Sequence, residues 1–350
     1  MPVVRPFRAV RYDEAVAGPL ERLVAPPYDV ISPEEREELL ARDPHNVVNL
    51  TLPDSEAEAA RLWREWQAEG VLVREPEPSY WALSQDYVGP DGVARTRSGL
   101  VVSLETEPYE TKAVLPHERT HRGPKEGRIR LLRAVGAQLE PIFLLYDGDA
   151  PVQPPDRSPD LEAEGTRLWR IDVDLAPAFR DRQLLIADGH HRYESALAEG
   201  TPILAVLVST SDPGLTIFPT HRVFAQAPRA RWDGPSLDTE SALRQLARVP
   251  AGRAAFVQYD GRASLVDTGP GRPLDVEVID GLGHEGLSYT PDWREATRRV
   301  DDGEAAVAYL MRPARIEDVF EVARAGEVLP QKTTYFYPKL LSGLLFHPLD

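Results

Sequence analysis

The sequence predicts an α+β fold with mixed β-sheets and peripheral helices. Apolar runs of strand length alternate with amphipathic segments of helix length, but without the regular spacing of a doubly wound parallel sheet. Neither a GxGxxG nor a Walker A sequence is present, so the two common nucleotide-binding loops are excluded. A chain of 350 residues exceeds the usual length of one domain, and we expect two compact units.

Several segments carry helix signals. The capping box Ser32–Glu35, with proline in the first turn, predicts a helix that runs to about Arg42. Trp63 and Trp66 lie at helical spacing and predict a second helix over residues 54–70, with both tryptophans in the core. We expect further helices over residues 125–139 and 316–325.

Strand signals occur between these helices. Residues 79–88 and 97–104 flank the turn sequence Gly89-Pro90-Asp91-Gly92, which predicts a β-hairpin. We expect further strands over residues 141–146, 183–187, 202–209, 253–259, 263–267 and 305–311.

Composition excludes several classes of site and partner. The chain has no cysteine, which excludes disulfides, cysteine-based zinc sites and thiol nucleophiles. A net charge of −16 makes it a poor binder of nucleic acid, because phosphate contacts supply most non-specific affinity. The N-terminal residues lack the apolar stretch of a signal peptide, and no run approaches the roughly 20 apolar residues that cross a bilayer. We therefore expect a cytoplasmic protein without nucleic-acid or membrane partners.

Residues 112–133 form a basic segment within this acidic chain. Seven lysines and arginines and two histidines are opposed there only by Glu118 and Glu126. The segment suggests a small anionic ligand, and the alternative is a solvated basic helix face.

The most informative segment is Leu184–Ala198, in which an apolar strand runs into Asp188-Gly189 and then into a helix. His190–Arg192 are thereby placed at the helix N-terminus, where free backbone N–H groups and the helix dipole favour an anion. Gly189 permits a sharp turn and the close approach of a ligand, and Arg192 suits a two-pronged contact with phosphate. We interpret this junction as an anion site, in which one of the two histidines can instead buttress the turn.

A second segment, Leu115–Arg122 (LPHERTHR), sets Glu118 among basic residues after an expected short strand over residues 111–114. An ionised carboxylate there suits a general base for a hydroxyl nucleophile, or a metal ligand. The alternative is that Glu118 only pairs with Arg119 or Arg122.

A third segment, Leu329–Lys339 (LPQKTTYFYPK), sets Lys332 beside the hydroxyls of Thr333 and Thr334. These groups suit a phosphate, or the carboxylate and ammonium of an amino acid. The three aromatic residues that follow wall a pocket or join the core, and for Phe336 we expect the core.

Two weaker candidates stay open. Thr220-His221-Arg222 is a His–Arg pair beside a strand. Ala25–Val30 (APPYDV) is a rigid loop that holds Tyr28 and Asp29, either for a ligand or as a structural turn.

These segments together resemble known families. The strand–DGHHR–helix element resembles the core of the ParB/sulfiredoxin-like superfamily, whose members bind phosphates at that place. The order of Pro116–Glu118, Asp188–Arg192 and Pro330–Thr334 resembles the free L-serine kinases, from about residue 111 onward. Nearly the whole chain also resembles a bacterial family of unknown function with the signature stretches APPYDV, LPHE, ADGHHRY, THR and PQKTTYFYPK.

The resemblance to the kinases implies a role for each matching residue. Glu118 would take the proton from the substrate hydroxyl, and Asp188 would act near Mg²⁺ or the transferring phosphoryl group. The donor phosphates would be bound by His117, Gly189, His190, His191, Arg192 and Arg222. The acceptor would lie against Lys332, Thr333, Thr334 and Tyr335.

The resemblance also implies a division of the chain and an activity. Residues 1–110 would form an N-terminal α+β region, residues 111–225 a ParB/sulfiredoxin-like catalytic core, and residues 226–350 an α+β region that closes the substrate site. The activity would be that of a phosphotransferase with an alcohol group as acceptor, foremost L-serine giving O-phosphoserine. ATP, ADP or pyrophosphate would be the donor and Mg²⁺ the cofactor.

Two other functions stay open. One is a nucleotide- or phosphate-binding regulatory module without kinase activity. The other is a metal-dependent hydrolase that uses Asp188, His190, His191 and His221, although adjacent side chains of a helix point apart. Where archaeal kinases have Arg-His after Lys-Thr-Thr, this chain has Tyr335-Phe336, so the sequence does not fix the acceptor.

Overall fold

The computed structural model describes residues 1–118, 122–228, 232–270 and 274–349. The chain forms two compact units, as expected from its length. The first unit comprises residues 1–215, 323–327 and 338–350, and the second comprises residues 216–322 and 328–337. The chain therefore leaves the first unit after residue 215 and returns to it twice. The division into three parts at residues 110 and 225 stays a prediction.

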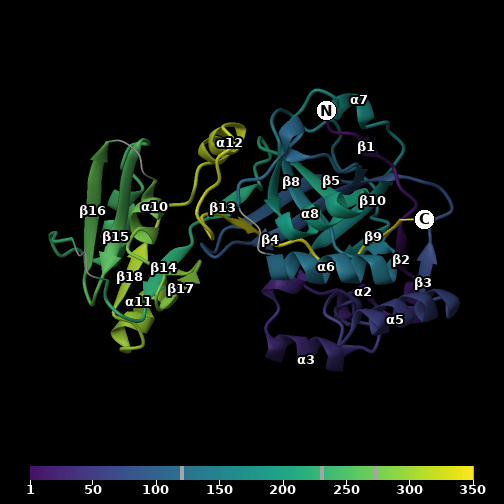
Figure 1. Cartoon of the computed structure of the whole chain (residues 1–350), viewed down its shortest axis with the longest axis horizontal. Coiled ribbons are helices and arrows are strands. Elements are labelled where there is room, and N and C mark those ends of the chain that lie inside the picture. Colours follow the sequence, from purple (N-terminus) through teal and green to yellow (C-terminus); the bar gives the residue numbers. More distant parts are fainter. Residues whose placement is uncertain (119–121, 229–231, 271–273, 350) are drawn as a thin grey trace. The chain divides into compact units, whose positions relative to one another are not determined.

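A mixed sheet of nine strands is the centre of the first unit (Figure 1). Its strands, in spatial order, are β6 (Val114–Leu115), β11 (Leu184–Asp188), β8 (Ile142–Tyr146), β12 (Ile203–Ser209), β5 (Ala94–Leu104), β4 (Tyr80–Val88), β10 (Thr166–Ile171) and β9 (Leu161–Ala163), with β1 (Val4–Arg5) also paired to β5. The β6–β11 and β8–β12 pairs are parallel and the other pairs are antiparallel. The predicted α+β class with mixed sheets is confirmed.

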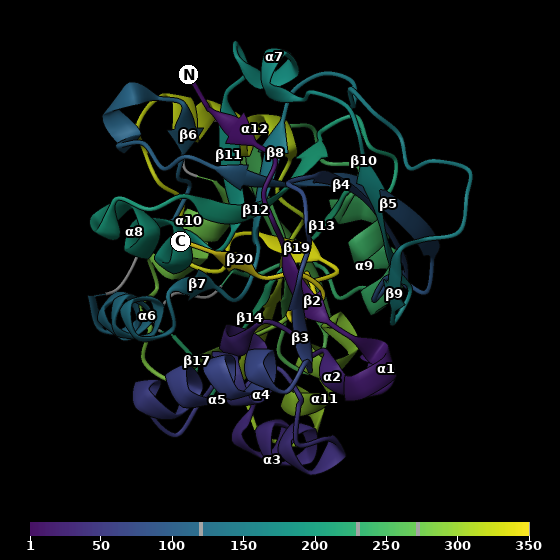
Figure 2. The same cartoon turned by 90° about the vertical axis from the view of Figure 1, so that its right-hand side faces the viewer.

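Helices and two small ribbons surround this sheet. The helices are α1 (Glu14–Ala17), α2 (Leu20–Leu23), α3 (Pro33–Arg42), α4 (Val48–Thr51), α5 (Glu56–Ala68), α6 (Arg122–Val135), α7 (Ala176–Phe179) and α8 (His190–Glu199), with 3₁₀ turns η1 (Tyr28–Val30) and η2 (Tyr109–Thr111). The ribbons pair β2 (Val10–Tyr12) with β3 (Leu72–Arg74), and β7 (Ala137–Gln138) with β20 (His347–Pro348). Helices α6 and α8 lie side by side next to the sheet (Figure 2).

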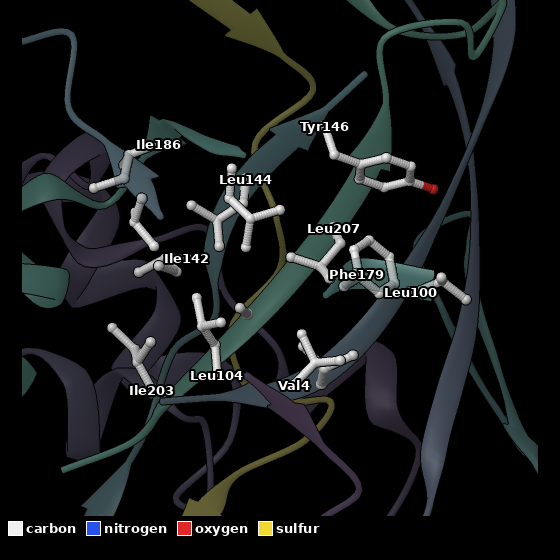
Figure 3. Close-up of a cluster of buried hydrophobic side chains, with 14 of the residues drawn as sticks. Val4, Leu100, Leu104, Ile142, Leu144, Tyr146, Phe179, Ile186, Ile203 and Leu207 are labelled. Atoms are coloured by element: carbon white, nitrogen blue, oxygen red, sulfur yellow. The ribbon is translucent and has the colours of Figure 1, made fainter. Parts of the chain in front are cut away.

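The main core of this unit fills one face of the nine-stranded sheet. Figure 3 shows side chains from β5, β8 and β12 converging there, with Phe179 of α7 against Tyr146. The two rings meet edge to face, with centroids 5.0 Å apart. Each such side chain, once fully buried, contributes about 1.5–3 kcal/mol to stability, so this face fixes the strands that carry the site.

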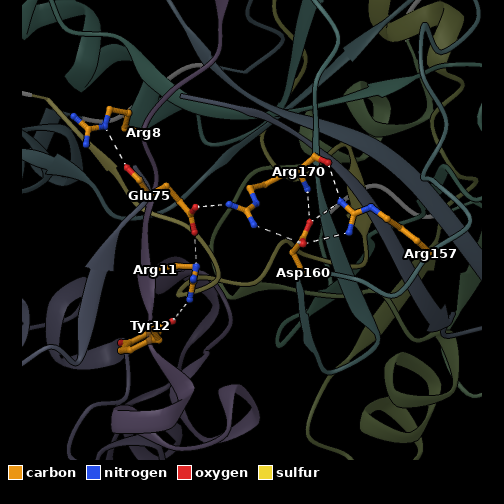
Figure 4. Close-up of polar contacts among 7 residues, drawn as sticks. All are labelled: Arg8, Arg11, Tyr12, Glu75, Arg157, Asp160 and Arg170. Carbon is orange, nitrogen blue, oxygen red and sulfur yellow. Dashed lines mark hydrogen bonds and ion pairs between the residues drawn. The ribbon is translucent and has the colours of Figure 1, made fainter. Parts of the chain in front are cut away.

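A buried carboxylate ties the β2–β3 ribbon to the sheet. Glu75 pairs through its two oxygens with Arg11 of β2 at 2.6 Å and with Arg170 of β10 at 2.7 Å (Figure 4). Its side chain is only 5% exposed. The Arg11 and Arg170 side chains are 31% and 45% exposed, so solvent partly screens each pair. The two pairs together link the N-terminal segment to the sheet.

The second unit is built on an antiparallel sheet of five strands. Their order is β16 (Ala263–Pro270), β15 (Arg253–Tyr259), β18 (Val307–Leu310), β14 (His221–Phe224) and β17 (Leu287–Thr290). The other elements of this unit are α9 (Thr239–Leu246), α10 (Asp275–Asp280), α11 (Trp293–Asp301) and the strand pair β13 (Thr216–Phe218) and β19 (Tyr335–Tyr337). Helix α12 (Ile316–Arg324) carries the chain back into the first unit.

Most of the helices and strands expected from the sequence are present, and two of them differ in their bounds. The capping box at Ser32 and the burial of Trp63 and Trp66 are confirmed. The helix expected over residues 125–139 ends at Val135, because Gly136 adopts a φ of 72° and the chain continues as β7. The strand expected over residues 111–114 is wrong at its start, since residue 111 ends a 3₁₀ turn and β6 begins at Val114. No helix in the described ranges combines the length and apolar character needed to cross a membrane.

Candidate functional site

The predicted strand–DGHHR–helix element is present at the β11–α8 junction. Gly189 is the N-cap of α8 with φ 97°, and Gly200 ends the helix. A Cβ atom at position 189 would lie 2.5 Å from Cγ2 of Ile142 in β8. Only glycine therefore allows this turn to pack against the neighbouring strand.

The segment that precedes Glu118 lies against this junction. β6 runs parallel to β11, and beyond it the backbone N–H of His117 donates to Nε2 of His190 at 3.3 Å. The His117 ring contacts the carbonyl oxygen of Ile186 through Nδ1 at 2.6 Å. Because a carbonyl only accepts, Nδ1 carries the proton. Glu118, half-buried, is the next residue along the chain.

The two contacting histidines are electrically neutral. Burial lowers the pKa of both His117 and His190, and their proximity to each other lowers the pKa of His190 further. Their hydrogen bonds fix the 114–118 segment to the start of α8, so His190 fits the buttressing alternative. His191 is half-buried. Phosphate binding by these histidines stays a prediction.

Asp188 lies between two cations. Lys339 pairs with its Oδ1, and Nη2 of Arg192 lies 2.8 Å from its Oδ2. Burial alone would raise the pKa of Asp188, but Lys339 and Arg192 outweigh burial and lower it. Arg192 also donates to the carbonyl of Pro141 at 2.5 Å. Asp188 is therefore ionised, and the guanidinium of Arg192 is already bonded within the protein.

Lys339 was not predicted from the sequence. It lies 151 residues from Asp188, so no local pattern links the two. The available signal was its place at the end of the PQKTTYFYPK stretch.

The APPYDV loop lies next to the same cluster through Glu140. The backbone N–H of Tyr28 donates to Glu140 at 2.9 Å, and the guanidinium of Arg128 lies 4.0 Å above the Tyr28 ring. Glu140 and Arg128 line a small cavity of about 40 Å³ together with Arg192. The charges of Glu140 and Asp29 also act on Arg192. The loop thus shapes the electrostatic field around the candidate site, and its role in binding a ligand stays a prediction.

The basic segment is largely neutralised within the protein. Lys125 and Arg133 of α6 pair with carboxylates of α8, and Arg130 pairs with a carboxylate of α5. These pairs favour the alternative of a helix face without a ligand. Arg119 and His121 lie outside the described residues, as does the side chain of Arg122, so their predicted pairing with Glu118 is not described.

The remaining predicted residues belong to the second unit. Arg222 is fully buried and donates to the carbonyl oxygens of Thr220 at 2.7 Å and Lys332 at 3.2 Å. Thr333 closes a local turn through its hydroxyl, 2.5 Å from the carbonyl of Pro330. Arg222 and the Lys-Thr-Thr turn are therefore brought together.

Four further positions of the predicted set lie in the second unit. Thr334 and Tyr335 are half-buried, whereas Phe336 is 1% exposed, which confirms its place in the core. His221 is buried and accepts a hydrogen bond from the backbone N–H of Met311 at 3.0 Å. Convergence of these residues with Asp188 stays a prediction.

A metal site formed by protein groups alone is not present in the part of the chain described here. No three His, Asp or Glu side chains there are grouped to hold an ion. Both carboxylate oxygens of Asp188 bind cations of the protein. The expected place of Mg²⁺ near Asp188 stays a prediction.

Comparison with known proteins gives a family match. A family model described as "Protein of unknown function (DUF1015)" matches residues 4–263. A search of curated proteins found no match.

Three solved structures show a distant likeness. One is a free serine kinase in complex with AMP, 17% identical, which covers 70% of this chain and 92% of that chain with a TM-score of 0.42. SbnI with a C-terminal truncation from Staphylococcus aureus is 14% identical and covers 71% of this chain and 87% of that chain, with a TM-score of 0.42. A conserved hypothetical protein from Pyrococcus furiosus is 17% identical and covers 70% and 95%, with a TM-score of 0.37. At these TM-scores the likeness carries no argument about activity.

Proposed function

The chain belongs to the family described as protein of unknown function (DUF1015), and we propose that it is a small-molecule kinase. It transfers a phosphoryl group to a hydroxyl-bearing metabolite, foremost L-serine, and releases O-phosphoserine. The donor is ATP, ADP or pyrophosphate.

One observation carries this proposal. The hydrogen bond from His117 to His190 holds the residue before Glu118 against the N-terminus of α8. A helix N-terminus favours an anion, and the Glu118 carboxylate is proposed to act on a hydroxyl that approaches that anion. The cations Lys339 and Arg192 lie at the same junction. Phosphoryl transfer needs mainly positioning and neutralisation of charge, and these groups supply both.

The proposed step is a simple displacement. The Glu118 carboxylate takes the proton of the acceptor hydroxyl as the hydroxyl oxygen forms a bond to the terminal phosphorus of the donor. The bond from that phosphorus to the bridging oxygen breaks, and its electron pair leaves with the shortened donor. The proton on Glu118 then passes to solvent. Glu118 must be ionised at the start, as a general base requires.

Mg²⁺ enters this proposal with the donor. When bound, the ion neutralises phosphate charge, and it is held through the phosphates because Asp188 is occupied by Lys339 and Arg192. The acceptor is proposed to lie against Lys332, Thr333, Thr334 and Tyr335. Arg222, through its bonds to the Lys-Thr-Thr turn, fixes that turn in position.

The alternative is a nucleotide- or phosphate-binding regulatory module without kinase activity. The Arg192 guanidinium bonds to Asp188 and to Pro141, and in such a module these groups would only shape the binding site. Such a module would bind a nucleotide tightly and show no turnover that depends on an acceptor.

A matrix assay tests the proposal. The full chain is incubated with Mg²⁺, each of the three donors and a panel of hydroxy amino acids, and phosphorylated products are identified by mass spectrometry. We expect O-phosphoserine with one donor. Absence of a phosphorylated product from every donor and acceptor pair would falsify the proposal, and tight donor binding alone would support the regulatory module.

A further inference from the structure

Lys339 contacts the candidate site, and the sequence assigned no role to this residue. The chain re-enters the first unit at residue 338, and the next residue, Lys339, pairs with Asp188. The Lys339 side chain is 20% exposed, compared with 15% for Asp188 and 8% for Arg192. Of the three charged groups, Lys339 is the one most open to an incoming ligand.

Two buried side chains fix the backbone that carries Lys339. Nη2 of Arg97 donates to the carbonyl of Pro338 at 2.9 Å, and Nε2 of Gln85 donates to the carbonyl of Lys339 at 3.2 Å. Arg97 is fully buried and also donates to Gln85 at 2.5 Å. Burial of a guanidinium carries a large desolvation cost. The buried Arg97 side chain offsets this cost with hydrogen bonds that hold the backbone of residues 338–339 in place.

The residue type at position 339 is unusual for this chain. Only four of the 40 lysine and arginine residues are lysines, so arginine supplies nearly all of the protein's cations, including those of most ion pairs. Lysine differs from arginine as a compact point charge with three donors. Such a group can hold a carboxylate and a phosphate oxygen at the same time.

We propose that Lys339 is a further donor-binding residue, whose ammonium contacts the phosphate chain of the donor. Asp188 and the Gln85–Arg97 pair are positioning residues that hold this ammonium at the start of α8. The inference rests on the proposed function for the identity of the ligand as a donor, and its chemical class is a di- or triphosphate chain.

Direct binding tests this assignment without the need for turnover. Pyrophosphate, ADP and ATP, each with Mg²⁺, are titrated into the full chain by calorimetry. Lys339→Met should weaken binding of the preferred ligand by about tenfold or more, the usual worth of a charge-assisted hydrogen bond. Lys339→Arg should bind the preferred ligand as weakly as Lys339→Met does. Arg61→Met, which removes one exposed charge from α5, is the matched control and should bind as the parent does.

A double variant separates the roles of Asp188 and Lys339. If Asp188 acts only through Lys339, Asp188→Asn with Lys339→Met should bind as weakly as Lys339→Met alone. Lys339→Met leaves the Asp188 carboxylate without its lysine partner. The double variant lacks that carboxylate charge, so it tests the assignment even if the single variant folds poorly. If the affinity losses of Asp188→Asn alone and of Lys339→Met alone add up in the double variant, the positioning role of Asp188 is contradicted.

Failure of the inference and failure of the proposed function give different results. Parent-like binding by Lys339→Met, or no binding of any phosphate chain by the parent, would overturn the inference. Binding that depends on Lys339 without transfer to any acceptor would uphold the inference and overturn the kinase proposal.

Discussion

At the scale of single residues, Gly189 shows how closely the candidate site depends on one backbone position. Its φ of 97° is accessible to glycine, and its missing side chain leaves room for Ile142 of the neighbouring strand. Both properties place the start of α8 so that the His190 side chain accepts a hydrogen bond from the backbone N–H of His117.

Replacement of this glycine should therefore destabilise the protein. Gly189→Ala combines a left-handed backbone, which costs about 1–2 kcal/mol, with overpacking against Ile142, which costs about 1–3 kcal/mol. Gly200→Ala, at the other end of the helix, is the matched control, because φ is 65° there and no atom lies within 4 Å of the added Cβ. Urea unfolding measures both variants. Equal losses would show that contact with Ile142 is unimportant.

At this scale, the sequence predicted the groups whose positions follow from local patterns. The DGHHR turn, the glycine at its centre and the core position of Phe336 follow from neighbouring residues in the sequence. Lys339 and Glu140 do not, because their partners are 151 and 112 residues away. The sequence also could not show that His117 and His190 bond to each other, since that contact needs β6 to pair with β11.

At the scale of elements, α6 illustrates how charge patterns are ambiguous. In the sequence, the cations of this helix suggested a site for a small anionic ligand. In the structure, Arg133 pairs with Glu199 at 2.6 Å and Lys125 pairs with Glu194 at 3.0 Å. Interactions between neighbouring helices explain this charge, which a single-helix pattern could not reveal. Capping signals were more reliable, because they act within one turn of the chain, as at Ser32.

A substitution in α6 tests this interpretation. Arg133 is 66% exposed, so Arg133→Ala should leave the free energy of unfolding nearly unchanged. It should leave the binding of pyrophosphate, ADP and ATP unchanged, because Arg133 contacts α8 at the end remote in sequence from His190. A loss of phosphate binding as large as that of Lys339→Met would return the basic segment to the candidate site.

At the scale of the whole molecule, buried neutral histidines occur in both units. Burial lowers the pKa of His221 in the second unit and of His347 in the first, in each case to about 4. In the unfolded chain the pKa is about 6.5. The unfolded state therefore binds more protons as the pH falls below 6.5, so the stability contributed by each histidine is complete above that value and is lost toward pH 4.

Stability should follow this titration. Between pH 7.5 and pH 4.5 each of these two histidines should cost about 2–3 kcal/mol of the free energy of unfolding. His221→Asn can keep an acceptor for the N–H of Met311 but cannot titrate, so it should show a smaller loss over the same range. The measurement is urea unfolding at several pH values. A stability independent of pH, or an equal slope in the variant, would contradict the assigned burial.

The discontinuous units could not be found from the sequence alone. Chain length predicted two units, but the return of residues 323–327 and 338–350 to the first unit depends on long-range packing. No composition change marks those crossings, and the Pro-rich stretch near residue 155 joins two strands of the same sheet.

The most direct test concerns Glu118 and separates binding from chemistry. Donor affinity and the rate of transfer to L-serine, or to the acceptor found in the matrix assay, are measured for the parent chain and for Glu118→Gln. A general base predicts a rate lower by at least about two orders of magnitude with donor affinity unchanged. Transfer by Glu118→Gln at the parental rate would contradict the account.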